Sequence, residues 1–262
     1  MKILHDVHDE RLDLYRDLRH AQSPHTRSRV FLTDGEKITA SVLQSSLHVV
    51  SILLTEELYA KYIPAIQSKV NPEQCFILSK KDMDALVGFD LHSPMMSIVE
   101  EPETPDLLSL KGPIIALNGI VNSDNVGGII RNAIGLGYKS IITDSTTSSP
   151  YLRRAVRVSM GAVAFAQCVK SNDLVHDLEK LKNSRGIPII SAEITDGSMD
   201  LNSFVFPQDF ILILGSEGNG VQSEVLAISD KIVHINMSEP IKSLNVASSS
   251  AIILHAAGSQ TR

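Results

Sequence analysis

The sequence predicts an α/β protein built on a mostly parallel sheet with helices on both faces, preceded by a second, smaller α/β domain. Three observations lead to this prediction. Over residues 114–262, apolar segments of strand length alternate with helix-length segments, a pattern typical of parallel strands joined by crossover helices. The segment 210–214 is apolar throughout and stops at Gly215, as a strand buried on both faces does. An acidic, proline-containing segment at 101–113 reads as a linker between the domains 1–100 and 114–262.

The composition is that of a globular chain and excludes several classes of protein. The 262 residues are 43% hydrophobic, with a mean hydropathy of +0.07 and a net charge of −6. No apolar run reaches the roughly 18–20 residues of a membrane span, and the opening residues are too charged for a signal peptide, so we expect a cytoplasmic protein. Cys75 and Cys168 lie outside any CxxC pair, which predicts reduced thiols and no metal site.

The first hundred residues predict a small α/β domain. Leucine and tyrosine recur at helical spacing over 9–19, which predicts a short amphipathic helix. The expected order beyond it is strand 30–32, helix 36–44, strand 49–54, helix 56–66, strand 75–78 and helix 80–87. An acidic chain would bind a polyanion only through local basic clusters. Such a cluster taken alone is more often a solvated surface than a binding site. The candidates for phosphate contacts are Arg27, Arg29, Arg153, Arg154 and Arg157.

The order of elements in 114–262 is regular. We expect strands at 114–117, 140–143, 163–168, 187–192, 210–214 and 232–235. Helices are expected at 125–136, 152–160 and 173–182, with a last helix opening near Ser243. The carboxyl ends of parallel strands meet at one edge of a sheet, where open α/β sheets bind ligands. The loops that follow 210–214 and 232–235 should therefore form one crevice.

Two segments at that edge have the composition of a binding site. The loop 215–220, GSEGNG, places three glycines around one carboxylate, so that its backbone can turn sharply and approach a ligand. After the first strand, Asn125 is expected to cap a helix, and Gly127 and Gly128 leave room over its first turn. Arg131 follows within a turn, where its planar guanidinium suits a phosphate. The glycines do not fit the GxGxxG dinucleotide motif, and the sequence contains no GxSxG, HExxH or P-loop pattern.

Three blocks of the sequence resemble, in order and in spacing, the motifs of the SpoU (TrmH) family of RNA 2′-O-ribose methyltransferases, in the SPOUT superfamily. The first is NVGGIIRNA at 125–133, and the second is LGSEGNGV at 214–221. The third combines INM at 235–237 with SLNV at 243–246. The segments SPY at 149–151 and RVSMGA at 157–162 also resemble that family. The similarity covers about residues 114–257, while the first hundred residues resemble the family's substrate-binding domain less specifically.

The resemblance implies a C-terminal trefoil knot, a homodimer, and transfer of a methyl group from S-adenosylmethionine to a ribose 2′-hydroxyl in ribosomal or transfer RNA. By this similarity the catalytic set is Arg131, Asn125, Glu217, Ser243 and Asn245. The implied cofactor contacts are Leu214, Gly215, Gly218, Ile235, Met237 and Leu244. The alternative is an RNA-binding or ribosome-assembly protein with a vestigial cofactor pocket.

A guanidinium keeps its proton at physiological pH, so Arg131 is expected to bind the ribose-phosphate and stabilise the developing alkoxide, oriented by Glu217 and Asn245. Three residues depart from the family pattern: threonine, proline and serine are common where this chain has Asn132, Asn236 and Ala247. Asn236 is expected to loosen the cofactor loop, because it lacks the fixed backbone of proline.

Overall fold

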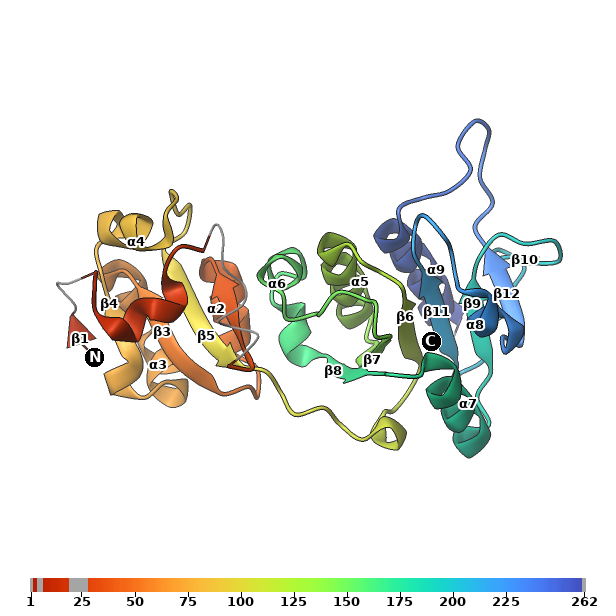
Figure 1. The fold of residues 1–262 in the computed structure, drawn as a ribbon, viewed down its shortest axis with the longest axis horizontal. Helices are drawn as coiled ribbons and strands as arrows, with labels where there is room; N and C mark the ends of the chain where they lie inside the picture. Colours follow the sequence, from red (N-terminus) through yellow and green to blue (C-terminus); the bar gives the residue numbers. More distant parts are fainter. Residues whose placement is uncertain (1, 4–6, 19–27, 261–262) are drawn as a thin grey trace. The chain divides into compact units, whose positions relative to one another are not determined.

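The computed structural model describes residues 2–3, 7–18 and 28–260 of the chain (Figure 1). The chain forms two compact units, and the first is discontinuous in sequence. Met1–Pro102 and Tyr151–Ala164 make up the first unit, and Glu103–Pro150 and Phe165–Arg262 make up the second. Within the part of the chain that is described, none of the helices has the length and apolar character needed to cross a bilayer.

The first unit is built on a five-stranded mixed sheet with the order β1-β4-β3-β5-β2. β5 pairs antiparallel with both β2 and β3, whereas β4 pairs parallel with β3 and β1. The strands are β1 (Lys2–Ile3), β2 (Val30–Asp34), β3 (Val49–Leu54), β4 (Cys75–Ile77) and β5 (Met95–Glu100). The helices are α2 (Glu36–Leu43), α3 (Glu56–Lys69), α4 (Lys80–Val87) and α6 (Arg153–Val158), with 3-10 turns η1 (Glu10–Tyr15) and η2 (Pro72–Gln74). The apolar positions expected to form a helix over 9–19 thus form the shorter η1.

The second unit is built on a seven-stranded sheet with the order β10-β12-β9-β11-β6-β7-β8, and all of its pairings are parallel. The strands are β6 (Ile114–Asn118), β7 (Ser140–Thr143), β8 (Gln167–Lys170), β9 (Ile189–Ala192), β10 (Met199–Asp200), β11 (Ile211–Gly215) and β12 (Lys231–His234). The helices are α5 (Ser123–Gly135), α7 (Leu174–Arg185), α8 (Ser223–Ala227) and α9 (Val246–Gln260), and η3 (Leu107–Ser109) precedes β6. The predicted α/β class with a parallel sheet is confirmed.

Helices cover both faces of this sheet because successive residues of a buried strand point to opposite faces. On one face, alternate residues of the central strands pack against α7 and α8 in a core that includes Ile114, Ala116, Ile211, Ile213, Leu178, Leu181 and Val225. On the other face, α5 and α9 pack against each other, and α9 also contacts β11. The Tyr138 hydroxyl donates a hydrogen bond of 3.1 Å to the Leu254 carbonyl of α9. Loops, rather than helices, lie at the carboxyl edge of the sheet.

Two sequence predictions for this region were wrong in detail. The predicted strand 163–168 is instead the 3-10 turn η4 (Ala162–Phe165) followed by β8, which starts at Gln167. Met160 and Gly161 have positive φ angles of 55° and 81°, so the chain turns there, and a short apolar run does not distinguish a strand from a buried turn. The predicted helix 125–136 begins earlier: Asn122 is its cap and accepts a 2.9 Å hydrogen bond from the Asp124 N–H. Asn125 therefore lies within the first turn and is not the cap.

Candidate active site

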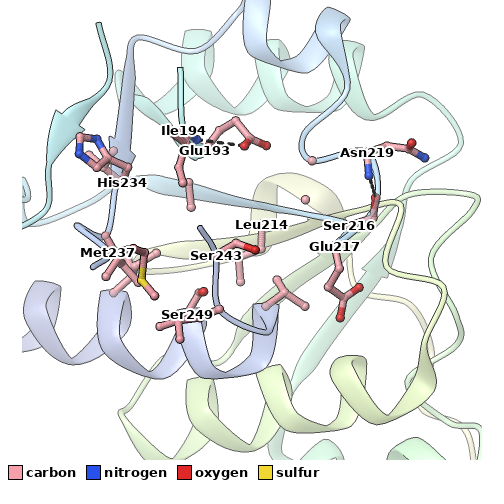
Figure 2. Close-up of a pocket in the computed structure, with 18 of the residues that line it drawn as sticks. Glu193, Ile194, Leu214, Ser216, Glu217, Asn219, His234, Met237, Ser243 and Ser249 are labelled. Atoms are coloured by element: carbon pink, nitrogen blue, oxygen red, sulfur yellow. Dashed lines mark hydrogen bonds between the residues drawn. The ribbon is translucent and has the colours of Figure 1, made fainter. Parts of the chain in front are cut away.

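A pocket of about 350 Å³ lies at the carboxyl edge of the seven-stranded sheet (Figure 2). The segments that follow β9, β11 and β12 line it, together with the start of α9. Small-molecule sites typically have volumes of about 300–1,000 Å³. All six residues expected to contact the cofactor line this pocket: Leu214, Gly215, Gly218, Ile235, Met237 and Leu244. The expected crevice between the loops after β11 and β12 is therefore present.

The pocket combines an apolar wall with small polar groups. Val246 and Ile253 of α9 add to the apolar lining, and Ser216, Ser243 and Ser249 bring hydroxyls to it. Figure 2 shows Met237 and Ser249 on one side of the pocket, with Ser216 and Glu217 on the opposite side. Apolar surface with a few placed polar groups is typical of a site for an organic cofactor.

The glycine-rich loop after β11 closes on itself. The Ser216 N–H donates to the Gly220 carbonyl at 3.1 Å, and the Gly220 N–H donates back to the Ser216 carbonyl at 2.9 Å. A Cβ on Gly215 would lie 2.3 Å from backbone atoms of Gly220 and Val221, and Gly220 has a φ of +67°. Only glycine fits both positions, because the first has no space for a side chain and the second has left-handed backbone. The loop is thus held in one shape at the mouth of the pocket.

Glu193 fixes the end of this loop, and the sequence analysis missed it. It follows β9, and its Oε2 accepts a 2.8 Å hydrogen bond from the Val221 N–H. Its Oε1 accepts a 3.0 Å hydrogen bond from the Ile194 N–H (Figure 2). A Cβ on Gly220 would lie 2.1 Å from Glu193 Oε2, so the carboxylate and the glycine fit together. A carboxylate directly after a predicted parallel strand was the signal that could have identified Glu193.

Residues from all three sequence motifs meet beside the pocket. Asn125 of α5 donates a hydrogen bond from Nδ2 to Glu217 Oε1. Asn245 donates from its Nδ2 to Asn125 Oδ1 at 2.9 Å and to Glu217 Oε1 at 3.3 Å. Asn125 is 6% exposed, whereas Glu217 and Asn245 are exposed. We call these three residues the amide–carboxylate cluster. It holds the one carboxylate of the glycine-rich loop in a fixed place.

Arg131 lies on α5, as Asn125 does, but forms no hydrogen bond with this cluster in the described part of the chain. It is exposed on α5 and makes no hydrogen bond or ion pair with any described residue. It does not line the pocket, whereas Ser243 does. Among the described residues of one chain, neither Glu217 nor Asn245 forms a hydrogen bond with Arg131, so their role in orienting it stays a prediction.

A second polar network joins the strands beneath the loops. Asn118, the last residue of β6, donates from Nδ2 to Asp144 at 3.0 Å and to Gln222 Oε1 at 2.9 Å. Its Oδ1 accepts a 2.8 Å hydrogen bond from the Gln222 N–H. Asp144, after β7, also accepts from the Gly119 N–H at 2.9 Å and the Thr147 N–H at 2.7 Å. These contacts tie the segment after the glycine-rich loop to the ends of β6 and β7.

The residues that depart from the family pattern make specific contacts. Asn236 donates from Nδ2 to Asp200 Oδ2 at 2.5 Å, and its Oδ1 lies 3.1 Å from His234 Nε2. Asn236 thus links the loop after β12 to β10 through its side chain, where proline would constrain the backbone alone. Asn132 donates from Nδ2 to the Ala247 carbonyl at 2.7 Å, which joins α5 to α9.

The candidate RNA-contacting arginines differ in their surroundings. Arg27 lies outside the described residues, while Arg29, Arg154 and Arg157 are exposed. Arg153 is engaged within the first unit: it donates to the Leu18 carbonyl at 2.9 Å and to Asp34 Oδ2 at 2.5 Å. Its guanidinium also lies 4.9 Å from the centre of the Phe89 ring. The two terminal nitrogens of Arg153 are therefore used inside the protein, and its phosphate contact stays a prediction.

The relatives found by sequence comparison are named as RNA methyltransferases. An uncharacterized tRNA/rRNA methyltransferase of Mycobacterium tuberculosis is 28% identical over 260 residues, which cover 95% of this chain and 89% of the relative. The 23S rRNA (guanosine(2553)-2′-O)-methyltransferase RlmP of Bacillus subtilis is 23% identical over 256 residues, which cover 97% of this chain and 98% of RlmP.

The fold is similar to that of solved structures over nearly the whole chain. The AdoMet-bound rRNA methyltransferase of Sinorhizobium meliloti superposes with a TM-score of 0.83 at 19% identity, covering 97% of this chain and 96% of that one. The SpoU methyltransferase AviRb of Streptomyces viridochromogenes, in complex with AdoMet, has a TM-score of 0.81 at 21% identity, covering 96% and 98%.

The profile of one protein family also matches the sequence. The match to the SpoU rRNA Methylase family covers residues 112–255, more than half of the chain. It includes the three motif blocks and every residue of the amide–carboxylate cluster. The resemblance seen in those motifs is confirmed, and this chain belongs to the SpoU rRNA Methylase family.

Proposed function

We propose that this chain transfers the methyl group of S-adenosylmethionine to the 2′-hydroxyl of a ribose in structured RNA. The observation that carries the proposal is the pocket at the carboxyl edge of the sheet, which adjoins the amide–carboxylate cluster assembled from all three family motifs. An RNA-binding protein with a vestigial pocket would not need to keep this cluster assembled. Both the family and the site therefore favour the enzyme.

The pocket residues fit S-adenosylmethionine. This cofactor has no phosphate, so its site needs apolar surface and hydrogen-bonding groups rather than a cluster of cations. Leu214, Met237, Leu244 and Ile253 provide apolar surface, and Ser243 adds a hydroxyl. When bound, the cofactor supplies an electrophilic methyl group on a positively charged sulfur.

The residues of the chain contribute mainly by holding the two reactants in line, because orientation can supply much of the rate enhancement of a transfer between two bound molecules. Asn125 and Asn245 fix the carboxylate of Glu217 beside the pocket. Arg131 binds the phosphate of the target nucleotide and stabilises the charge that develops on the ribose oxygen, because a guanidinium donates hydrogen bonds but does not accept a proton.

The active assembly in this proposal is a homodimer with a C-terminal trefoil knot. Arg131 is exposed and does not line the pocket of its own chain, so a second copy is the source of the arginine for each pocket. The knot in this proposal rests on the match of residues 112–255 to the SpoU rRNA Methylase family.

The first unit binds the RNA in this proposal. The contacts with phosphates come from Arg29, Arg154 and Arg157, together with Arg27, which lies outside the described residues. Each phosphate contact releases counterions, so RNA affinity should fall as salt rises. We expect Arg157→Ala to lower the slope of log affinity against log salt by about 1. A slope unchanged by this substitution would remove Arg157 from the interface.

Methyl transfer tests the function directly. Purified protein is incubated with S-adenosylmethionine labelled in the methyl group and with separated ribosomal and transfer RNA. Because RlmP is named for 23S rRNA, we expect label in a ribose of ribosomal RNA. Arg131→Ala should abolish transfer while the cofactor still binds. Lys180→Ala, which removes an exposed cation from α7, is the matched control and should act as wild type. Cofactor binding without transfer to either RNA would contradict the proposal.

A further inference from the structure

The cofactor pocket carries two carboxylates and, among the described residues that line it, no lysine or arginine. The carboxylates belong to Glu193 after β9 and Glu217 after β11. The other titratable residue in the lining is His234, whose ring nitrogens contact Ser198 Oγ at 3.0 Å and Asn236 Oδ1 at 3.1 Å. The pocket therefore presents negative charge to its ligand.

Neither carboxylate has its hydrogen-bonding capacity filled within the chain. A carboxylate can accept about four hydrogen bonds, two at each oxygen. Glu193 accepts one N–H at each oxygen, from Val221 and Ile194. Glu217 accepts from Asn125 and Asn245 at Oε1. Both groups are thus fixed in place by neutral donors, and no cation of the pocket lining neutralises them.

Transfer of a methyl group changes the charge of the molecule in the pocket. The bond between the sulfur and the methyl carbon breaks, and its electron pair stays on the sulfur. The ribose oxygen forms the new bond to that carbon, and the hydroxyl proton leaves to the solvent. The sulfur begins as a positively charged sulfonium and ends as a neutral thioether, while the rest of the molecule is unchanged.

We propose that Glu193 and Glu217 make the pocket selective for the positively charged cofactor over its neutral product, S-adenosylhomocysteine. This inference rests on the proposed function. Attraction between unlike charges is several times stronger at a partly buried site than in bulk water, and Glu193 is half-buried. The attraction ends when the methyl group leaves. The carboxylates of the pocket thus favour cofactor binding and assist product release.

The test measures dissociation constants of S-adenosylmethionine and S-adenosylhomocysteine by isothermal titration calorimetry at low salt. The ratio of the two constants is the readout, because a displaced loop weakens both ligands alike and leaves the ratio unchanged. Wild type should bind the cofactor about fivefold to tenfold more tightly than the product. Glu193→Gln should reduce this ratio to below about threefold, and added salt should reduce it in wild type. Glu224→Gln, which neutralises an exposed carboxylate outside this pocket, should leave it unchanged.

Glu193→Asp separates charge from shape, because it keeps the carboxylate on a shorter side chain. It should preserve the ratio even where both affinities fall. A ratio in Glu193→Gln equal to that of wild type overturns the inference, and so does a ratio lost as fully in Glu193→Asp as in Glu193→Gln. Wild-type protein that binds neither ligand contradicts the proposed function itself, which distinguishes the two failures.

Discussion

Asn245 has two structural roles that substitution can separate. Its Oδ1 accepts a 2.9 Å hydrogen bond from the Ala247 N–H in the first turn of α9, as a helix cap does. Its Nδ2 donates to Asn125 and Glu217 in the amide–carboxylate cluster. Asn245→Ser keeps a good cap residue but loses the reach to both acceptors. Asn245→Ala loses the cap as well.

The two losses differ in size and in what they affect. Removing the cap costs about 1 kcal/mol of helix stability, which lowers the Tm by about 2–4 °C for a domain of 150–250 residues. Removing the two donated hydrogen bonds costs about 1–2 kcal/mol in total, because both Asn245 and Glu217 are exposed. That second loss loosens Glu217 rather than unfolding the chain, and it corresponds to a rise of about 5–30-fold in the Kd for S-adenosylmethionine.

The assays are thermal unfolding and calorimetric titration with S-adenosylmethionine. We expect Asn245→Ser to melt close to wild type and to bind the cofactor weakly, and Asn245→Ala to be impaired in both. Asn245→Asp should keep the cap but place a second carboxylate near Glu217, which costs about 1–4 kcal/mol at 4 Å between the limits of bulk water and a protein surface. An Asn245→Ser variant that binds the cofactor as wild type does, or melts as low as Asn245→Ala, would contradict the separation of the two roles.

Three further predictions concern packing and pH. A Cβ on Gly128 would lie 2.8 Å from the Ala247 Cβ, so Gly128→Ala should destabilise the fold by about 1 kcal/mol. Adding Ala247→Gly should restore the Tm, and a double variant that melts as low as Gly128→Ala would contradict this contact. Burial raises the pKa of Tyr15, whose hydroxyl lies 2.8 Å from Ser51 Oγ. Its stabilising contribution is therefore complete below about pH 10 and is lost as pH rises further, so the Tm of wild type should fall above about pH 10 and that of Tyr15→Phe should fall less; parallel curves would refute this. Arg153→Lys should lower stability by about 1–2 kcal/mol because lysine cannot replace the paired donors of the guanidinium; an unchanged Tm would contradict this structural role.

The sheet of the second unit and its pocket could be predicted from the sequence because their signals are local. Each buried parallel strand is a short apolar run, and the topology of parallel strands brings the segments after them to one edge. The glycines of 215–220 correctly predicted a tight loop, since Gly215 has no space for a Cβ and Gly220 has positive φ. These local signals predicted the two loops that line the pocket, whereas the six cofactor residues named in advance came from the family resemblance.

The contacts between side chains far apart in sequence could not be predicted. Asn122 and Asn125 both suit a helix cap, and only the backbone geometry shows that Asn122 takes this role and frees Asn125 to reach Glu217. Glu193 contacts a loop more than twenty residues later in the chain; its place directly after a strand marks it as a candidate, but does not show which N–H it accepts from.

The discontinuity of the first unit limits how this protein can be divided. Tyr151–Ala164 belongs to the first unit by its contacts but falls inside the family match at residues 112–255. A fragment cut at the linker 101–113 would lack α6, which packs against β2, and with it the Arg153 contact to Asp34. The two units therefore cannot be exchanged between relatives as continuous sequence segments. A chimera would have to take α6 and the five-stranded sheet of the first unit from the same parent. Changes in the first unit are therefore constrained by a segment that is encoded inside the region matching the SpoU rRNA Methylase family.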